Sequence, residues 1–226
     1  MIDQFLWLIF PYLCLASFII GHIYRYKHDQ FTWTAKSSEF IEKKQLVIGS
    51  LLFHIGVIPV AFGHVAGLGI PKEWMRTIGV NDHLYHIGAV YIGGLFGVLT
   101  LLGMLMLTAR RVTKRSVRKL SSSSDIAVNV LLLLIICLGV YSTLVTNTIQ
   151  HDFDYRETIS VWFRDLLIFR PDVSYMSSVP LSFKLHMLLG FLIIGLWPYT
   201  RLVHVWSVPL SYVGRSYILY RRHKHR

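Results

Sequence analysis

The sequence has few charged residues and few cysteines. Charged side chains make up 15% of the 226 residues, so the chain has little of the surface chemistry that a soluble protein needs. The two cysteines, Cys14 and Cys137, both lie inside apolar runs, and neither a disulfide framework nor a thiolate metal site is expected. No Cys-X-X-Cys-His motif is present, which excludes covalent attachment of a c-type haem through that motif.

Long hydrophobic runs dominate what is present. Apolar residues make up 54% of the chain, and five runs are each about as long as the ~20 residues that cross a hydrocarbon core. These runs cover residues 5–24, 46–66, 84–109, 125–146 and 181–204. The sequence therefore predicts an all-α integral membrane protein with five transmembrane helices in a single domain, residues 1–226. No basic residue precedes the first run, so we expect it to stay as a helix and not to be removed as a signal peptide.

The excess of positive charge predicts the topology. The formal net charge is +11, and lysine and arginine cluster in the segments 25–45, 110–124 and 205–226, whereas the alternate connections hold fewer. Because cytoplasmic loops collect lysine and arginine, this alternation places the N-terminus outside and the tail 205–226 in the cytoplasm. We interpret the charge as a sign of topology, with lipid and no nucleic acid as the partner.

One connection is long. Within residues 147–180, the stretch "ETISVWFRDLLIF" has apolar residues at nearly helical spacing. It predicts a short helix lying at the outer membrane interface, anchored by Trp162 and Phe163. An irregular surface loop is an equally good interpretation of the same pattern.

Four of the 11 histidines lie within or at the ends of two apolar helices: His54, His64, His186 and His204. Polar groups in such positions are costly and point to a function. His54 and His64 are ten residues apart, about 15 Å of helical rise, and His186 and His204 are eighteen apart, about 27 Å and five full turns. Each helix therefore presents two histidines on one broad side, at two depths. Others fall at helix ends or in polar segments, where an interfacial or solvated position explains them: His22, His28, His151, His223 and His225.

The antiparallel directions of the two helices decide which histidines can meet. His64 and His186 both fall near the outer surface, and His54 and His204 both fall toward the inner one. The opposite pairing would span about 30 Å, which no single ligand bridges. The inner pair fits less well, because straight helices leave a mismatch of roughly 15 Å in depth. Helix tilt and a kink at Pro198 would reduce that mismatch.

Two imidazoles from different helices suit the two axial positions of a haem iron. Two such pairs predict two b-type haems stacked across the membrane. A zinc site usually needs four ligands and a proton relay favours carboxylates, and neither depth supplies these groups.

Small and basic residues support the haem interpretation. Gly56, Gly63, Gly67 and Gly190 would leave room for a flat macrocycle, although close helix packing explains them equally well. Basic side chains at the inner membrane edge could pair with haem propionates, and positive-inside charge is the alternative. These are Arg110, Arg111 and Arg201.

Four stretches together resemble the γ subunit of membrane-bound respiratory nitrate reductase, a five-helix dihaem cytochrome b that oxidises quinol. They are "GHIYRYKHDQFTWTAKSSEF", "LLFHIGVIPVAFGHVAG", "FKLHMLLG" and "RLVHVWSVP". The match covers nearly the whole chain, and the four histidine contexts make it specific. The resemblance implies that His64 and His186 hold the outer haem and that His54 and His204 hold the inner one.

The resemblance also implies the partners. Family members accept electrons from menaquinol or ubiquinol near the outer haem and pass them to an iron-sulfur β subunit, which feeds a molybdenum-containing α subunit. In some members a lysine at the start of the third helix is associated with quinol binding, and here Tyr85 occupies that position. We expect the quinol site near His64, with His83, Tyr85 or His86 contacting the quinol hydroxyl.

Two other interpretations remain open at this stage. The chain could be the dihaem subunit of another quinone-linked enzyme, such as a formate or succinate dehydrogenase. It could also be a transporter or assembly protein whose histidines bind a transition metal or satisfy hydrogen bonds.

Overall fold

The computed structural model describes residues 1–29, 33, 42–149 and 153–207. Five helices in it are long and apolar enough to cross a membrane: Ile2–His28, Lys44–Gly69, Asp82–Thr113, Ser123–Ile149 and Leu181–Tyr199. The predicted all-helical fold with five spans is therefore confirmed. The predicted tail 205–226 is described only as far as Ser207. His151 also lies outside the described residues.

Each of the first four spans is made of consecutive helical segments. The bounds are α1 Ile2–Gln4, η1 Phe5–Ile9 and α2 Phe10–His28; α3 Lys44–His64 and η3 Val65–Gly69; α5 Asp82–Ile87, η4 Gly88–Ile92 and α6 Gly93–Thr113; α8 Ser123–Tyr141, η5 Ser142–Thr146 and α9 Asn147–Ile149. The segments η1, η3, η4 and η5 are π-helical turns, a geometry often found at functional sites. All four lie at the end of the bundle that also carries His64, which we call the outer end, following the predicted topology.

Short elements connect the spans. They are α4 Lys72–Thr77, α7 Arg115–Lys119, α10 Ile159–Leu167 and the 3₁₀ turn η6 Val173–Met176. Before α8, the Ser122 side chain caps the helix by accepting a hydrogen bond from the Asp125 backbone N–H, and the Asp125 carboxylate accepts one from the Ser122 backbone N–H. This reciprocal cap satisfies backbone donors that would otherwise lack partners.

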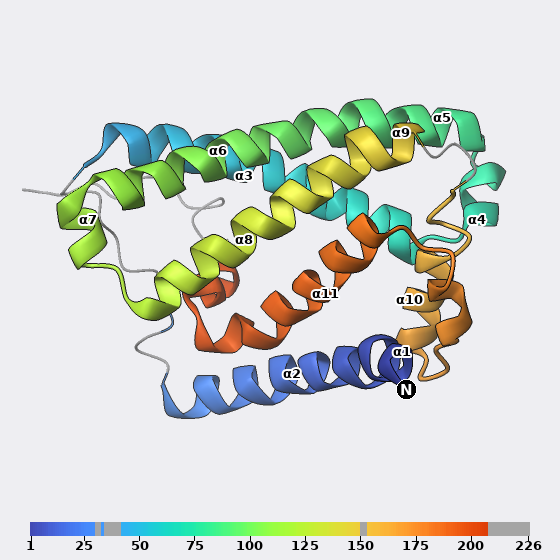
Figure 1. Ribbon diagram of the computed structural model, residues 1–226, viewed down its shortest axis with the longest axis horizontal. Helices are drawn as coiled ribbons and strands as arrows, with labels where there is room; N and C mark the ends of the chain where they lie inside the picture. Colours follow the sequence, from blue (N-terminus) through green and yellow to red (C-terminus); the bar gives the residue numbers. More distant parts are fainter. Residues whose placement is uncertain (30–32, 34–41, 150–152, 208–226) are drawn as a thin grey trace, which may run out of the picture.

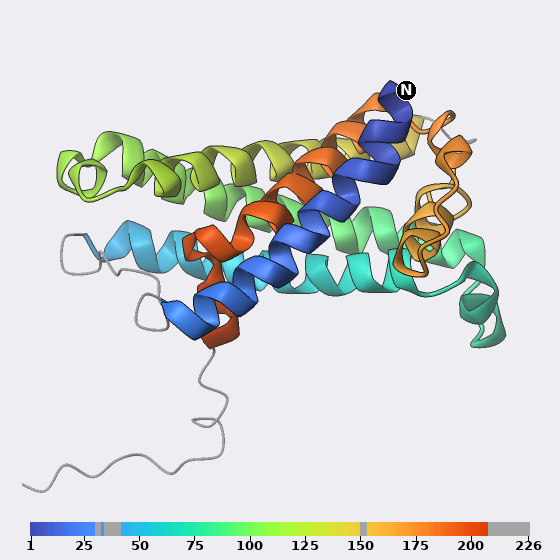
Figure 2. The same cartoon turned by 90° about the horizontal axis from the view of Figure 1, so that it is seen from below.

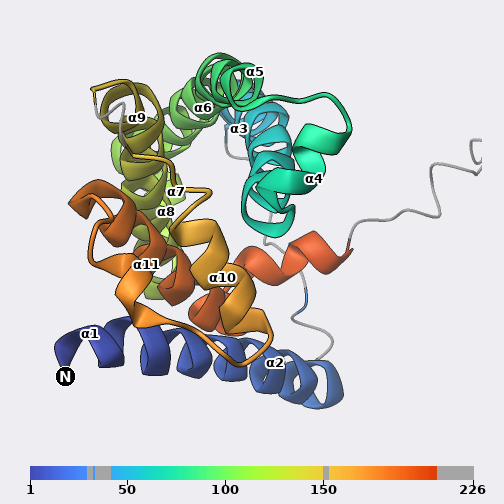
Figure 3. The same ribbon diagram turned by 90° about the vertical axis from the view of Figure 1, so that its right-hand side faces the viewer.

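The helices form an arc, visible when the bundle is viewed along its long axis (Figure 3). Extensive packing joins α3 to α6, α6 to α8, α8 to α11 (Leu181–Leu196) and α11 to α2. Small residues permit the closest approach: a Cβ on Gly103 of α6 would lie 2.8 Å from the Gly49 carbonyl oxygen of α3. In this packing order α6 and α8 come between α3 and α11, which carry the predicted histidine pairs, and α11 lies between α8 and α2 (Figure 1).

The fifth span ends earlier than predicted. α11 stops at Leu196, the 3₁₀ turn η7 covers Trp197–Tyr199, and Thr200 is extended (φ −122°, ψ 176°). A second 3₁₀ segment, η8, follows over Arg201–Ser207. Pro198 causes the break, because it lacks an N–H group and restricts the preceding residue. The prediction of a continuous helix over 181–204 was therefore wrong beyond Leu196.

The first helix holds this break in place. Arg25 donates through Nη1 to the carbonyl oxygens of Pro198 (2.6 Å) and Thr200 (3.0 Å), both at the break. Gly21 lies so close that a Cβ there would come within 2.7 Å of the Pro198 ring. Figure 2 shows α2 running alongside α11 to this point.

The described part of the long connection packs against the outer end of the bundle. The predicted short helix is confirmed as α10, but the prediction of Trp162 as an interface anchor was wrong. Its side chain is completely buried, stands edge-on to Trp7 with ring centroids 6.0 Å apart, and donates from Nε1 to the Trp7 carbonyl at 3.1 Å. Phe163 packs as a partly buried side chain against the same cluster. Burying the indole against other apolar residues is more favourable here than placing it at the membrane surface.

Candidate functional site

The structure brings His64 and His186 together at the outer end. Their ring centroids are 5.9 Å apart and the ring planes differ by 31°. His64 is the last residue of α3, and His186 lies in the second turn of α11. Two antiparallel spans that are not neighbours in the arc thus place one imidazole each at the same depth.

Hydrogen bonds select the same tautomer in both rings. The Nδ1 of His64 lies 2.8 Å from the Val60 carbonyl oxygen, and the Nδ1 of His186 lies 2.9 Å from the Ile135 carbonyl oxygen. Because a carbonyl oxygen only accepts, Nδ1 carries the proton in each neutral ring, and Nε2 keeps its lone pair. A ring held through Nδ1–H in this way is the usual form of a metal-ligating histidine.

The spacing of the pair fits an ion between the rings. Two metal–imidazole bonds of about 2 Å, together with the two ring radii, would separate the centroids by about 6 Å, compared with the 5.9 Å observed. Ordinary aromatic pairs also have such spacings, so the tautomers carry more weight than the distance. The described residues contain no group of three or more histidine, cysteine or carboxylate side chains that could hold a metal. The donor set is thus two imidazoles, which suits haem.

Glycines near this pair divide into two groups. A Cβ at Gly63 or Gly190 would meet no atom within 4 Å, so open space lies beside both. By contrast, a Cβ at Gly56 would strike the Thr100 backbone at 2.5 Å, and one at Gly67 the Tyr85 hydroxyl at 2.8 Å. The first two fit the predicted room for a macrocycle, whereas the other two permit close packing.

Gly139 is a residue that the sequence did not single out. It lies on α8 directly against His186, where a Cβ would be 2.8 Å from Cε1 and 3.2 Å from Nδ1. The absent side chain lets the imidazole reach the Ile135 carbonyl, one turn earlier on α8. This role depends on how α8 packs against α11, so the local sequence around Gly139 does not show it.

The inner pair is arranged differently. Among the described residues, ring contacts are found for His54 with Phe53 but not between His54 and His204. Each ring nevertheless has the same tautomer as the outer pair, with Nδ1 2.7 Å from a backbone carbonyl, that of Ser50 for His54 and that of Arg201 for His204. The break at Thr200 turns η8 across the bundle (Figure 3). His204 therefore lies less far toward the inner side than a straight continuation of α11 would place it.

His22 provides a contrast within the same membrane region. Its Nδ1 also lies 2.7 Å from a backbone carbonyl, that of Phe18, but its Nε2 accepts a hydrogen bond from Trp206 Nε1 at 3.1 Å. Both nitrogens are therefore occupied, and the ring has no lone pair left for a metal. The expectation of a non-ligand role for His22 agrees with this arrangement.

The three predicted propionate partners differ in what they already bind. Arg110 donates from Nε to Glu42 at 2.8 Å, and Arg201 donates from Nε to Asp125 at 2.7 Å. Arg111 donates from Nη1 to Ser121, but none of the described residues forms a hydrogen bond with its buried Nε. Of the three, Arg111 has the clearest spare donor for a further carboxylate.

Two of the three predicted quinol residues line a cavity at the outer end. It encloses about 170 Å³, and Tyr85 and His86 lie in its wall whereas His83 does not. Tyr85 and Tyr155 share a hydrogen bond between their hydroxyls (2.9 Å), and the Arg156 guanidinium lies 4.1 Å from the centre of the Tyr85 ring. Tyr155 and Arg156, which come from the long connection, were not predicted from the sequence.

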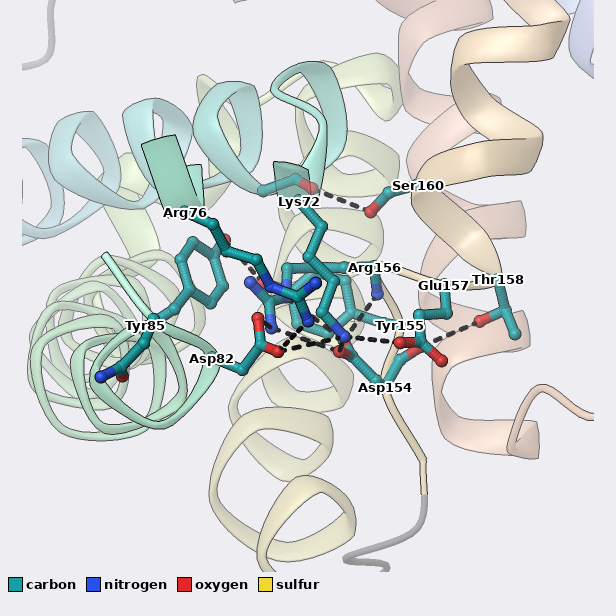
Figure 4. A network of polar contacts seen from close by, with 12 residues as sticks. Lys72, Arg76, Asp82, Tyr85, Asp154, Tyr155, Arg156, Glu157, Thr158 and Ser160 are labelled. Atoms are coloured by element: carbon teal, nitrogen blue, oxygen red, sulfur yellow. Dashed lines mark hydrogen bonds and ion pairs between the residues drawn. The ribbon is translucent and has the colours of Figure 1, made fainter. Parts of the chain in front are cut away.

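Ion pairs fasten this connection to the start of the third span (Figure 4). Lys72 pairs with Asp154 (3.0 Å), Asp82 (3.5 Å) and Glu157, and Arg156 pairs with both Asp82 and Asp154 at 3.2 Å. Burial alone would raise the pKa of Asp154, but hydrogen bonds from the Arg156 backbone and from Lys72 lower it overall. Burial raises the pKa of Tyr155, and the adjacent Tyr85 hydroxyl adds to this, so its phenol stays protonated and can donate.

Comparison with known proteins agrees with this architecture. A family model described as "Nitrate reductase gamma subunit" matches residues 3–223. The nitrate reductase gamma chain of Bacillus subtilis is 50% identical over 98% of this chain and 99% of its own length. The respiratory nitrate reductase 2 gamma chain of Escherichia coli is 38% identical over 97% of both chains. A nitrate reductase-like protein of Mycobacterium tuberculosis, NarX, is 36% identical over 98% of this chain but only 34% of its own length.

The full-length matches leave little of the chain unaccounted for. The five spans and the bacterial relatives together identify a multi-pass membrane protein of bacteria. We conclude that this chain belongs to the nitrate reductase gamma subunit family.

Proposed function

We propose that this chain is the membrane cytochrome b of a respiratory nitrate reductase. Quinol, either menaquinol or ubiquinol, is oxidised near the outer face. Two b-type haems, when bound, supply one-electron carriers at two depths that connect this face with a cytoplasmic iron-sulfur β subunit, and a molybdenum-containing α subunit reduces nitrate. The N-terminus is outside and the C-terminus is cytoplasmic.

The observation that carries the proposal is the outer pair. His64 and His186 converge from separate spans, each with Nδ1–H bound to a carbonyl oxygen and Nε2 left as a ligand. We assign these two to the outer haem and His54 with His204 to the inner haem. Arg111 is the best placed of the three arginines to bind a propionate, because its buried Nε has no partner in the described part of the chain.

The quinol site lies at the outer end, in the cavity lined by Tyr85 and His86. Gly67 lies one turn after His64, and a Cβ there would come within 2.8 Å of the Tyr85 hydroxyl and 3.0 Å of the Tyr155 hydroxyl, which places this cavity close to the proposed outer ligand. Oxidation here would release two protons outside while two electrons move inward. Each charge that crosses the membrane stores about 2.3 kcal/mol per 100 mV, so the reaction would conserve energy without a proton pump.

The test is a set of reduced-minus-oxidised spectra of the purified complex. We expect a b-type band in the wild type, partial loss of that band in His64→Gln and His186→Gln, and loss of quinol-dependent nitrate reduction in both. His22→Gln is the matched control, because the Nε2 of His22 is already occupied by Trp206, and its spectrum should equal that of the wild type. An unchanged band in both ligand variants would refute the assignment.

A further inference from the structure

Arg156 has a donor that nothing in the described part of the chain uses. Its side chain is only 6% exposed, yet its Nη1 is buried without a hydrogen-bond partner. The residue also lines the outer cavity. Leaving a buried charged donor unsatisfied is costly, and a ligand that enters the cavity from outside the chain could relieve this cost by offering Nη1 an acceptor.

The surrounding charges do not compete for that donor. Three cations (Lys72, Arg76 and Arg156) face three carboxylates (Asp82, Asp154 and Glu157), and ion pairs connect them all. The Nε and Nη2 of Arg156 already bind Asp154 and Asp82. With the charges balanced, the cluster favours a neutral ligand with an acceptor oxygen over an anion.

The tyrosine pair supplies a second donor at the same place. Tyr85 and Tyr155 share one hydrogen bond between two hydroxyls, so one of the two O–H groups remains available to donate. The Tyr85 ring lies under the Arg156 guanidinium, which fixes the two donors relative to each other.

We propose that Arg156 Nη1 and the spare hydroxyl of the Tyr85–Tyr155 pair hold one ring oxygen of the quinol, so that Arg156 and Tyr155 are substrate-binding residues. A quinol is neutral and its ring oxygens can accept hydrogen bonds. It would therefore supply the acceptor that these two donors lack. This inference rests on the proposed function and adds to it two residues from the connection between the fourth and fifth spans. It also explains why that connection is fastened to Asp82 by ion pairs.

The experiment compares variants of the intact complex with a short-chain quinol as donor. Arg156→Gln should lower kcat/KM by about 10- to 100-fold, the value of a lost hydrogen bond to a charged group. Tyr155→Phe removes a single oxygen atom and should lower it by about 3- to 10-fold. Arg156→Lys keeps a cationic donor and should restore part of the loss. The haem spectrum and nitrate reduction with a low-potential dye, which donates without occupying a quinol site, should stay at the wild-type level.

Two matched controls separate binding from folding. Arg76→Gln removes an ion pair to the same Asp82 from a half-exposed side chain outside the cavity wall, and Tyr12→Phe removes a tyrosine hydroxyl that binds the Leu166 carbonyl elsewhere. Both should keep wild-type kinetics. Wild-type kcat/KM in Tyr155→Phe, or an equal loss in Arg76→Gln and Arg156→Gln, would overturn the inference. A wild type with b haems but no quinol oxidation would instead overturn the proposed quinol site itself.

Discussion

Replacing Gly139 by alanine should disturb the outer haem without changing any ligand. The new Cβ would lie 2.8 Å from His186 Cε1, whereas ordinary contact begins at about 3.4 Å, so the imidazole must move by about 0.6 Å. Moving away from α8 stretches the 2.9 Å hydrogen bond to Ile135 toward the limit of such bonds. Losing the partner that orients a ligating histidine typically lowers metal affinity by 10- to 100-fold.

The assay for this variant is the haem content of the purified complex, followed by quinol-dependent nitrate reduction. We expect the outer b haem to be depleted and quinol activity to fall in proportion. Gly97→Ala is the control, because its Cβ would meet only Val140 on α8, at 3.3 Å, and would leave His186 untouched. Full haem content and activity in Gly139→Ala would refute the proposed packing between α8 and α11.

Three further outcomes are expected. Gly190→Ala should raise the stability of the haem-free chain by up to ~1 kcal/mol, because its Cβ meets nothing, yet lower haem loading; equal loading would show that the space holds no macrocycle. Trp162→Phe should lower the free energy of unfolding by about 1–3 kcal/mol, because the Trp7 carbonyl loses its hydrogen-bond partner; an unchanged melting temperature would contradict this. The lowered pKa of Asp154 means that its ion pair with Lys72 stabilises the connection above its unfolded-state pKa of about 3.9 and is lost as pH falls through the folded value. The hydrogen-exchange protection factors of residues 153–160, which are corrected for the pH dependence of intrinsic exchange, should thus be constant from pH 8 to 5 and fall below that, and this fall should be absent in Asp154→Asn.

The spans and the outer histidine pair could be predicted from the sequence for a simple reason. Helical rise and hydrophobic length are local properties, so counting residues from His54 to His64 and from His186 to His204 gives depth directly. The same counting failed at the end of the fifth span, where Pro198 and a contact from Arg25 end the helix early. Proline indicated a possible kink, but the resulting direction of η8 depends on another helix.

The cavity at the outer end was only half predictable. Tyr85 and His86 stand at the start of an apolar run, where a site was expected, but Tyr155 is 70 residues beyond Tyr85 in the chain, and Arg156 follows it directly. Nothing local marks them, because their roles arise from ion pairs between two connections. Trp162 was misplaced for the same reason: a tryptophan near a membrane end suits an interface unless another element covers it, as Trp7 does here.

The central claim is that His64 and His186 share one iron at the outer end of this bundle. The most direct measurement is the number of b-type haems per chain in the purified complex, determined for the wild type and for each single substitution of these two histidines. We expect two haems in the wild type and one in each variant, with the inner haem retained. Two haems in either variant, or none in the wild type, would contradict it.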